Sequence, residues 1–129
     1  MDEITKYWVE HSEYDLETAG AMLKAGRYLY VTFMCQQSIE KILKAIITTI
    51  SDVTPPRIHD LKKLAKIAYI DKKMSKEQID FCVNLTPFCF ITRYAEERER
   101  LSRLANRKLA EDYFKKTKEL YRWLRNLIK

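Results

Sequence analysis

The sequence contains few of the residues that make tight turns. Of its 129 residues, only two are glycine and three are proline. Because a β-sheet of this size needs many hairpins, each with its own turn residues, this scarcity favours long helices over strands. The length fits one domain with a substantial core. We therefore expect a single all-α domain over residues 1–129, an up-and-down bundle of four to five helices.

Cysteine and histidine are also scarce, which argues against a metal centre. The three cysteines, Cys35, Cys82 and Cys89, lie in apolar segments without Cys-x-x-Cys spacing. Thiols of this kind usually pack as small apolar side chains in a reducing compartment. With His11 and His59 as the only histidines, we expect no metal site, and no cofactor is predicted.

Targeting signals and membrane spans are missing from the sequence. The first residues lack the basic and then apolar pattern of a secretory signal. No apolar run approaches the roughly 18 residues that a membrane span requires. We expect a cytoplasmic protein that does not enter a membrane.

The sequence lacks the local motifs of several enzyme classes. It has no glycine-rich phosphate loop, no His-Glu-x-x-His motif, and no serine or cysteine placed beside a histidine as a nucleophile would be. His59 is a candidate general acid or base without an identified partner. Arg57 lies two residues before it, a spacing that directs the two side chains to different faces of a helix. Catalysis therefore has weak support.

The charge balance permits an anionic partner without requiring one. There are 24 basic and 18 acidic residues, which gives a net charge of +6. A basic protein attracts nucleotides or RNA, but both signs are mixed along this chain, as on ordinary helix surfaces. The charge alone therefore favours an ordinary solvated surface over a binding surface.

Apolar periodicity and helix breakers predict five helices. Gly26 is expected to end the first helix, and Ser75 with Gln78 predicts a capping box at the start of the fourth. Pro87 predicts a kink or a broken turn in that fourth helix. The charged segment after Tyr94 is expected to form a helical turn with solvated flanks. The expected helices cover residues 3–25, 29–50, a short stretch opened by 57–60, a stretch from 75 onward, and 109–128.

The first and last helices each carry one apolar stripe. On the first, the stripe is expected to contain Ile4, Trp8, His11, Asp15, Ala19 and Met22, widened by Tyr7, Tyr14, Leu16 and Leu23. On the last, it is expected to contain Leu109, Tyr113, Thr117, Leu120, Leu124 and Leu127. The last stripe fits packing within the bundle or a seam between two copies of the chain.

The second helix differs because it has two distinct faces. Its apolar face contains Ile39, Ile42, Ile46 and Ile50, and a polar row at helical spacing contains Gln37, Lys41, Lys44 and Thr48. The polar row needs water, a ligand or paired groups on other helices. It is either a solvated face or one wall of a polar site.

Polar residues elsewhere are candidates for the opposite wall of this site. Lys41, Lys44 and Arg93 are predicted phosphate contacts, and Gln37 and Tyr94 are predicted orienting or stacking groups. Supporting roles behind them are predicted for Asp15, Glu40, His59 and Asp60. The alternative is a hydrogen-bonded network that only fixes the register of the bundle, with each charge paired.

Several short motifs occur in an order and spacing that resemble a known family. They are Trp8, Asp15-Leu16, Gly26, Tyr28, Phe33, the segment QQSIEKILKA at 36–45, HDL at 59–61, and Arg93-Tyr94. Together they resemble the HEPN domain, the "higher eukaryotes and prokaryotes nucleotide-binding" helical bundle. This resemblance implies a bundle of four or five helices, a homodimer, and a minimal nucleotidyltransferase as partner in a toxin–antitoxin pair.

Many HEPN proteins are metal-independent ribonucleases that use an arginine followed, after four to six residues, by a histidine. The positions that would hold this arginine are occupied by Ile4, Thr5 and Lys6 before His11, and by Asp52, Val53 and Thr54 before His59. The resemblance therefore favours a non-catalytic member that binds a nucleotide or RNA segment, or that serves a nucleotidyltransferase as its helical partner. The alternatives are a ribonuclease with a rearranged site and a module for protein interaction or dimerisation only.

Overall fold

The computed structural model describes residues 1–129 and confirms that the protein is all-α. It contains six α-helices and two short 3-10 helices, which is one α-helix more than expected, because the charged segment after Tyr94 forms a complete helix. The elements are α1 (Glu3–Lys24), α2 (Tyr28–Ile50), α3 (Leu61–Ile67), η1 (Asp71–Lys73), α4 (Lys76–Leu85), η2 (Thr86–Phe90), α5 (Ala95–Leu104) and α6 (Arg107–Arg125).

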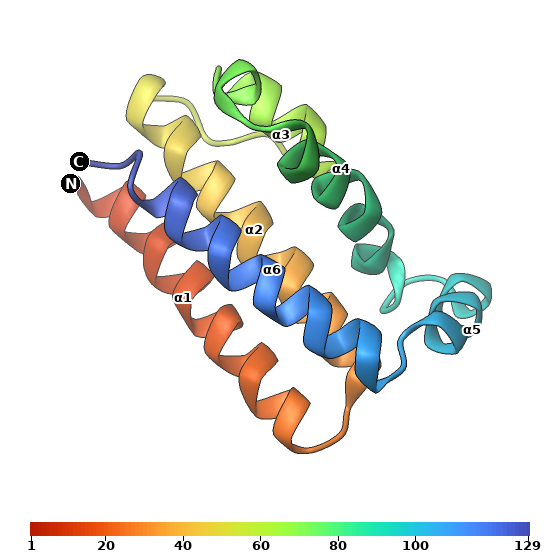
Figure 1. The fold of residues 1–129 in the computed structure, drawn as a ribbon. Helices are drawn as coiled ribbons and strands as arrows, with labels where there is room; N and C mark the ends of the chain where they lie inside the picture. Colours follow the sequence, from red (N-terminus) through yellow and green to blue (C-terminus); the bar gives the residue numbers. More distant parts are fainter.

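Helix α2 lies at the centre of an up-and-down arrangement. Figure 1 shows α1 running away from the N-terminus, α2 returning, α4 descending again after the short helix α3, and α6 returning to bring the two termini together. Helices α1 and α6 pack on one side of α2, and α3, α4 and η2 pack on the other. The short helix α5 projects at the end of the bundle (Figure 1). The segment from 42 to 48 in α2 is therefore buried without interruption.

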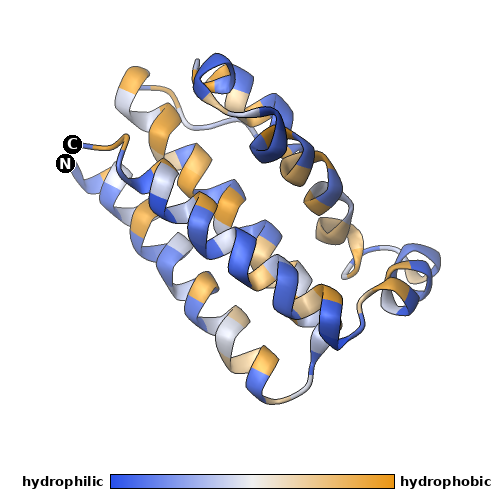
Figure 2. Cartoon of the chain, in the orientation of Figure 1, coloured by the Kyte–Doolittle hydropathy of each residue, from blue (hydrophilic) through white to orange (hydrophobic).

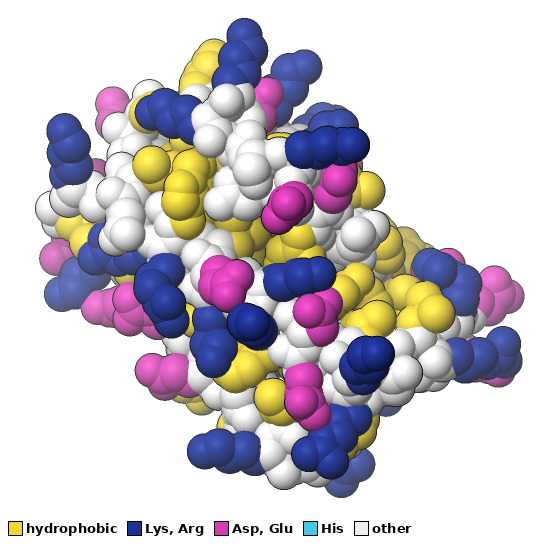
Figure 3. Space-filling view, viewed as in Figure 1, with side chains coloured by type: hydrophobic (Ala, Val, Ile, Leu, Met, Phe, Trp, Pro, Cys, Tyr) yellow, Lys and Arg dark blue, Asp and Glu magenta, His cyan; other side chains and the backbone are white.

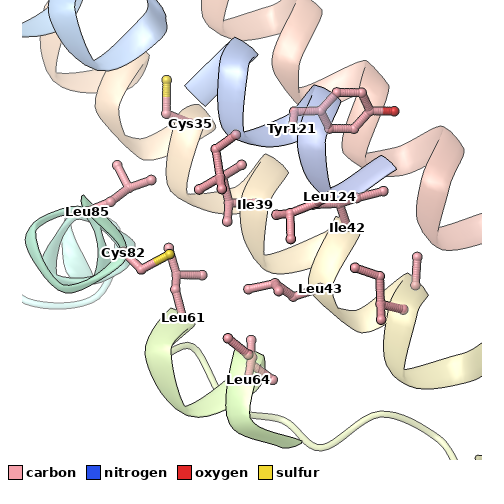
Figure 4. Close-up of a cluster of buried hydrophobic side chains, with 14 of the residues drawn as sticks. Cys35, Ile39, Ile42, Leu43, Leu61, Leu64, Cys82, Leu85, Tyr121 and Leu124 are labelled. Atoms are coloured by element: carbon pink, nitrogen blue, oxygen red, sulfur yellow. The ribbon is translucent and has the colours of Figure 1, made fainter. Parts of the chain in front are cut away.

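The main core surrounds the apolar side chains of α2. Ile39, Ile42 and Leu43 have no exposed surface. Figure 4 shows them between residues of α3 and α4 on one side and residues of α6 on the other, namely Leu61, Leu64, Cys82, Leu85, Tyr121 and Leu124. Figure 2 shows that α5 and the outward surface of α6 are mostly hydrophilic. The predicted stripe of α6 thus faces its own chain, with Thr117, Leu120 and Leu124 buried.

Local sequence signals account for most helix ends. The predicted capping box is present, because Ser75 Oγ accepts from the Gln78 amide at 3.1 Å while Gln78 Oε1 accepts from the Ser75 amide at 2.9 Å. Asp2, Asp60 and Asn106 cap α1, α3 and α6 in the same general way. As Pro87 predicts, the α-helical pattern breaks, and α4 gives way to η2 after Leu85.

The expected buried stripe of α1 is correct for Asp15 and Ala19 and wrong for several of its larger side chains. Ile4, Tyr7 and Tyr14 are 48%, 52% and 69% exposed, and His11 is exposed as well. Besides Asp15 and Ala19, the residues that α1 buries are Thr5, Val9 and Ser12. Small hydroxyl side chains face α2 because they find hydrogen-bond partners there: Thr5 bonds Thr48, and Ser12 bonds Ser38. Ile50 of α2, also expected inside, is 53% exposed.

Candidate functional site

A ladder of polar side chains runs along the buried surface of α2. Gln36, Glu40 and Lys44 follow one another at intervals of four residues and are 0%, 5% and 6% exposed. Glu40 accepts from both neighbours, from Gln36 Nε2 at 3.1 Å and from Lys44 Nζ at 3.0 Å. A buried carboxylate is stable only when it is paired and hydrogen-bonded, and these two contacts meet part of that requirement.

His59 completes the surroundings of this carboxylate from the loop before α3. Its Nδ1 lies 2.9 Å from Glu40 Oε1, and its carbonyl oxygen accepts from Gln36 Nε2 at 3.0 Å. A carboxylate partner requires Nδ1 to carry a proton, so that in the neutral ring Nε2 is the free acceptor. The His59 side chain is 30% exposed, whereas Glu40 is almost completely covered. Glu40 thus fixes an imidazole that remains open to solvent.

Arg93 and Tyr94 follow η2 on the same side of α2. Both side chains are exposed, and Arg93 forms no ion pair within the chain. The nearby Cys89 thiol relates Arg93 to Glu40. The pKa of this thiol is raised to about 11, mainly by burial; the Glu40 carboxylate contributes to the rise, and the Arg93 guanidinium opposes it. Both charges therefore act on one sulfur atom. The Leu61 amide donates to Thr86 Oγ1 at 3.1 Å, so the loop that carries His59 lies beside η2, which Arg93 follows.

The two lysines predicted to contact phosphate are engaged within the chain. Lys44 is held by Glu40, and its ammonium group lies 5.6 Å from the centre of the Trp8 ring. Lys41 reaches across to α1, where its Nζ lies 2.5 Å from Asp15 Oδ2. Each positive charge is therefore neutralised by a carboxylate. These contacts match the register-fixing network that was the alternative to a cleft.

The other predicted site residues do not form one cluster. Gln37 is half-buried and donates to Gln36 Oε1 at 2.7 Å. Asp60 is exposed and caps α3 by accepting from the Lys63 amide at 3.1 Å. Asp15 lies between α1 and α2 and contacts only the Lys41 end of the polar row. The predicted phosphate contacts and orienting groups nevertheless stay predictions.

Gln36 is the functional candidate that sequence reasoning missed. Its side chain is completely buried and joins three residues, Gln37, Glu40 and His59. The spacing of Gln36, Glu40 and Lys44 at i, i+4 and i+8 was visible in the sequence. The predicted polar row contains Gln37 and Lys41 instead, each one position further along the chain.

The arrangement has an acid–base group and a cation but no activated nucleophile. His59, oriented by Glu40, can accept or donate a proton at Nε2, and Arg93 can bind a phosphate oxygen. The raised pKa keeps Cys89 as a neutral thiol near pH 7. No three His, Cys, Asp or Glu side chains are grouped as metal ligands. Among the six α-helices, none is both long enough and apolar enough to cross a membrane.

Comparison with known proteins gives a family match and a structural match. The model of the HEPN domain matches residues 5–127. The fold is similar to the crystal structure of the protein TT1696 from Thermus thermophilus, with a TM-score of 0.80, 19% sequence identity, and coverage of 95% of this chain and 96% of that chain. At this identity the structural match shows the fold alone. No curated protein sequence matches the chain.

Proposed function

Because the chain belongs to the HEPN domain family, we propose that it binds the phosphate group of a nucleotide or of a single-stranded RNA segment without cleaving it. The proposed contacts are Arg93, Tyr94 and the free Nε2 edge of His59. One observation carries this proposal: the buried Glu40 carboxylate fixes His59 on a loop beside η2, and Arg93, which follows η2, is a guanidinium with no acidic partner in the chain.

Each of these groups suits a different part of such a ligand. A guanidinium without a carboxylate partner is free to form paired hydrogen bonds to phosphate oxygens. Tyr94 is 56% exposed and offers an aromatic face on which a base can stack. His59 donates from Nε2 when it is protonated, while Glu40 keeps the ring in place. In this proposal Lys41 and Lys44 do not contact the ligand. Lys41 holds α1 against α2, and Lys44 fixes Glu40.

The test is the affinity for a 5′-labelled single-stranded RNA, measured by fluorescence anisotropy at two salt concentrations. Arg93→Ala is expected to weaken RNA binding by about tenfold, because one charge-assisted phosphate contact is lost. It should also reduce the dependence of the affinity on salt. Arg122→Ala is the matched control, because it removes one exposed positive charge from α6 on another part of the surface. Equal losses for the two variants would reduce the interaction to non-specific charge attraction and reject the proposed site.

The same RNA distinguishes binding from cleavage. Cleavage through the 2′-hydroxyl needs a base and an acid in addition to a cation, and this site supplies a single imidazole. We therefore expect the labelled RNA to stay intact during incubation, as judged on a denaturing gel. Cleavage that is lost in His59→Ala would instead support a ribonuclease with a rearranged site.

A second candidate function, assembly with another subunit, is favoured by the exposed face of α1. Ile4, Tyr7, His11 and Tyr14 are spaced as in a helix-pairing seam, and the Tyr7 and His11 rings lie 4.2 Å apart. Large apolar groups exposed in a row commonly mark contact surfaces. The proposed partner is a second copy of the chain or a minimal nucleotidyltransferase, as the HEPN resemblance implies.

Sedimentation of the purified protein tests this assembly. We expect a dimer that Tyr7→Glu with Tyr14→Glu converts to a monomer, while Glu3→Ala with Glu17→Ala on the same helix leaves it unchanged. A monomeric wild-type protein that binds a co-expressed nucleotidyltransferase through the same two tyrosines would assign the face to that partner. A protein that stays monomeric and does not bind a nucleotidyltransferase would reject this candidate function.

A further inference from the structure

A groove lies between α4 and α6, away from the exposed seam of α1. Its volume is about 630 Å³. Both helices pack on α2, and across the groove floor they meet through Phe81 and Tyr113, whose ring centres are 5.2 Å apart in an edge-to-face contact. The volume is in the range of ligand sites, yet the groove has no part in the polar ladder described above.

The floor of the groove is aromatic and apolar. Phe81 and Leu120 are buried, and Tyr113 and Trp123 are half-buried, so each presents part of its surface in the groove. Burial raises the pKa of the Tyr113 hydroxyl, in keeping with a sparsely hydrated floor. Figure 3 shows apolar surface exposed between these two helices, with charged side chains on both sides.

The rim of the groove is acidic, although the protein as a whole is basic. Glu77, Asp80 and Glu119 line it with exposed carboxylates that form no ion pair within the chain. The only cation of the rim is Lys116, and Asp112 already neutralises it at 3.0 Å. The rim therefore carries excess negative charge on a molecule of net charge +6. By contrast, three lysines and two aspartates line the smaller hollow beside α3.

We propose that this groove binds a basic amphipathic helix of a partner protein. An apolar face of such a helix would cover Phe81, Leu120 and Trp123, and its lysine or arginine side chains would meet the acidic rim and the aromatic rings. A helix fits because the walls are themselves helices, and a third helix packs against such a pair ridge into groove. Helix α4 has ten residues, and at roughly 1.5 Å per residue it is long enough to lie beside about three turns of the bound helix.

The first experiment measures the affinity of the protein for a labelled peptide of about four helical turns, with leucines at helical spacing and lysines elsewhere. Binding is detected by fluorescence anisotropy of the peptide. The groove variant is Asp80→Lys with Glu119→Lys, and the matched control is Glu17→Lys with Asp52→Lys, which changes the net charge equally at exposed positions away from the groove. We expect the groove variant to bind the peptide about tenfold more weakly than the control does, since two rim attractions become repulsions. Equal weakening in both variants would overturn the proposal.

A second experiment places the peptide in the groove. In Trp8→Phe the only tryptophan left is Trp123, on the groove floor, so its emission reports contact there. The peptide is expected to shift this emission to shorter wavelength, and a peptide of the same composition without helical spacing is expected to leave it unchanged. Peptide binding without a change in Trp123 emission would overturn the proposal. A protein dimer that the groove variant abolishes, with no peptide binding, would also overturn it and assign the groove to a second copy of the chain.

Discussion

Ser12 on α1 and Ser38 on α2 each donate a hydrogen bond to the backbone of the other. Ser12 Oγ lies 2.7 Å from the Ser38 carbonyl oxygen, and Ser38 Oγ lies 2.9 Å from the Ser12 carbonyl oxygen. Both side chains have no exposed surface. Side chains of this size let two helix backbones approach closely, and each hydroxyl finds an acceptor on the facing helix. The close approach of α1 to α2 thus depends on small polar residues.

The first prediction concerns the size of the side chain at position 38. Ser38→Ala removes one interhelical hydrogen bond and should lower the free energy of unfolding by about 1 kcal/mol. Ser38→Leu forces extra carbon atoms into the crossing and should cost about 3 kcal/mol, the upper end for overpacking. Urea unfolding measures both. The control Thr49→Leu introduces the same side chain on the exposed side of α2 and should cost much less. Equal costs at positions 38 and 49 would contradict a tight crossing.

The same crossing explains why the phase of α1 could not be predicted from the sequence. Periodicity assigns the largest apolar residues to the interior, and on α1 that places Ile4, Tyr7 and Tyr14 inside. The structure buries Thr5 and Ser12 instead, because their partners Thr48 and Ser38 lie 43 and 26 residues away in the sequence. Helix boundaries were predictable because caps and breakers act within a few residues. Which face of a helix meets its neighbour depends on that neighbour.

The candidate site likewise combines features that follow from local sequence patterns with features that depend on residues far apart in the sequence. The sequence predicted a polar row on α2 and placed His59 and Arg93 among the candidates for the same site. It did not indicate that Lys41 would pair with Asp15, 26 residues away, or that Lys44 would pair with Glu40. Charge pairing decides whether a lysine is free to bind phosphate, and the pairing follows from tertiary structure.

The second prediction tests the buried pair of Glu40 and Lys44. Glu40→Ala leaves the Lys44 ammonium buried without a partner and should lower the free energy of unfolding by about 4 kcal/mol. Lys44→Met keeps the volume of the side chain, and Glu40 still accepts from Gln36 and His59. Lys44→Met should therefore cost clearly less than Glu40→Ala. The measurement is chemical unfolding near pH 7.

The double variant Glu40→Ala with Lys44→Met separates pairing from packing. Removing both charges together takes away the penalty of an isolated buried ion, so the double variant should be more stable than Glu40→Ala alone. If the effects of the two sites simply added, the two groups would not interact in the folded protein. That result would also weaken the proposal that Lys44 fixes Glu40 behind His59.

The third prediction comes from two helix ends with the same geometry. Gly26 after α1 and Tyr69 after α3 have positive φ angles of 74° and 59°. In each case the two amides that follow the helix close a Schellman motif, as in the bonds from Gly26 to Leu23 and from Arg27 to Met22. Glycine adopts this conformation freely, whereas tyrosine does so at a cost of about 1 kcal/mol.

Substitutions at these two positions should therefore act in opposite directions. Gly26→Ala should lower the melting temperature, because a Cβ is strained at this φ even though the space around it is open. Tyr69→Gly should raise it, since the Tyr69 side chain is 81% exposed and contributes little packing. Differential scanning calorimetry measures both shifts. A decrease for Tyr69→Gly would show that the ring contributes more through contacts than the backbone loses through strain.

The fourth prediction concerns stability at alkaline pH. Burial raises the pKa of the Cys35 thiol and of the Cys82 thiol from 9.0 to about 12. Above pH 9 the unfolded chain releases these protons while the folded protein keeps them, so the unfolded state becomes more favourable as the pH rises. The stability that the neutral thiols contribute is complete below pH 9 and is lost progressively toward pH 12.

Urea unfolding at a series of pH values on both sides of pH 9 measures this loss. The free energy of unfolding should fall by about 1 kcal/mol per pH unit for each thiol above roughly pH 9. Burial also raises the pKa of the Tyr113 hydroxyl, which adds to the fall at higher pH. The variant Cys35→Ala with Cys82→Ala isolates the contribution of the thiols. Its stability should decline less steeply just above pH 9 than that of the wild-type protein, because the contribution of these two thiols is gone. Parallel declines would mean that these two thiols are not kept neutral by burial.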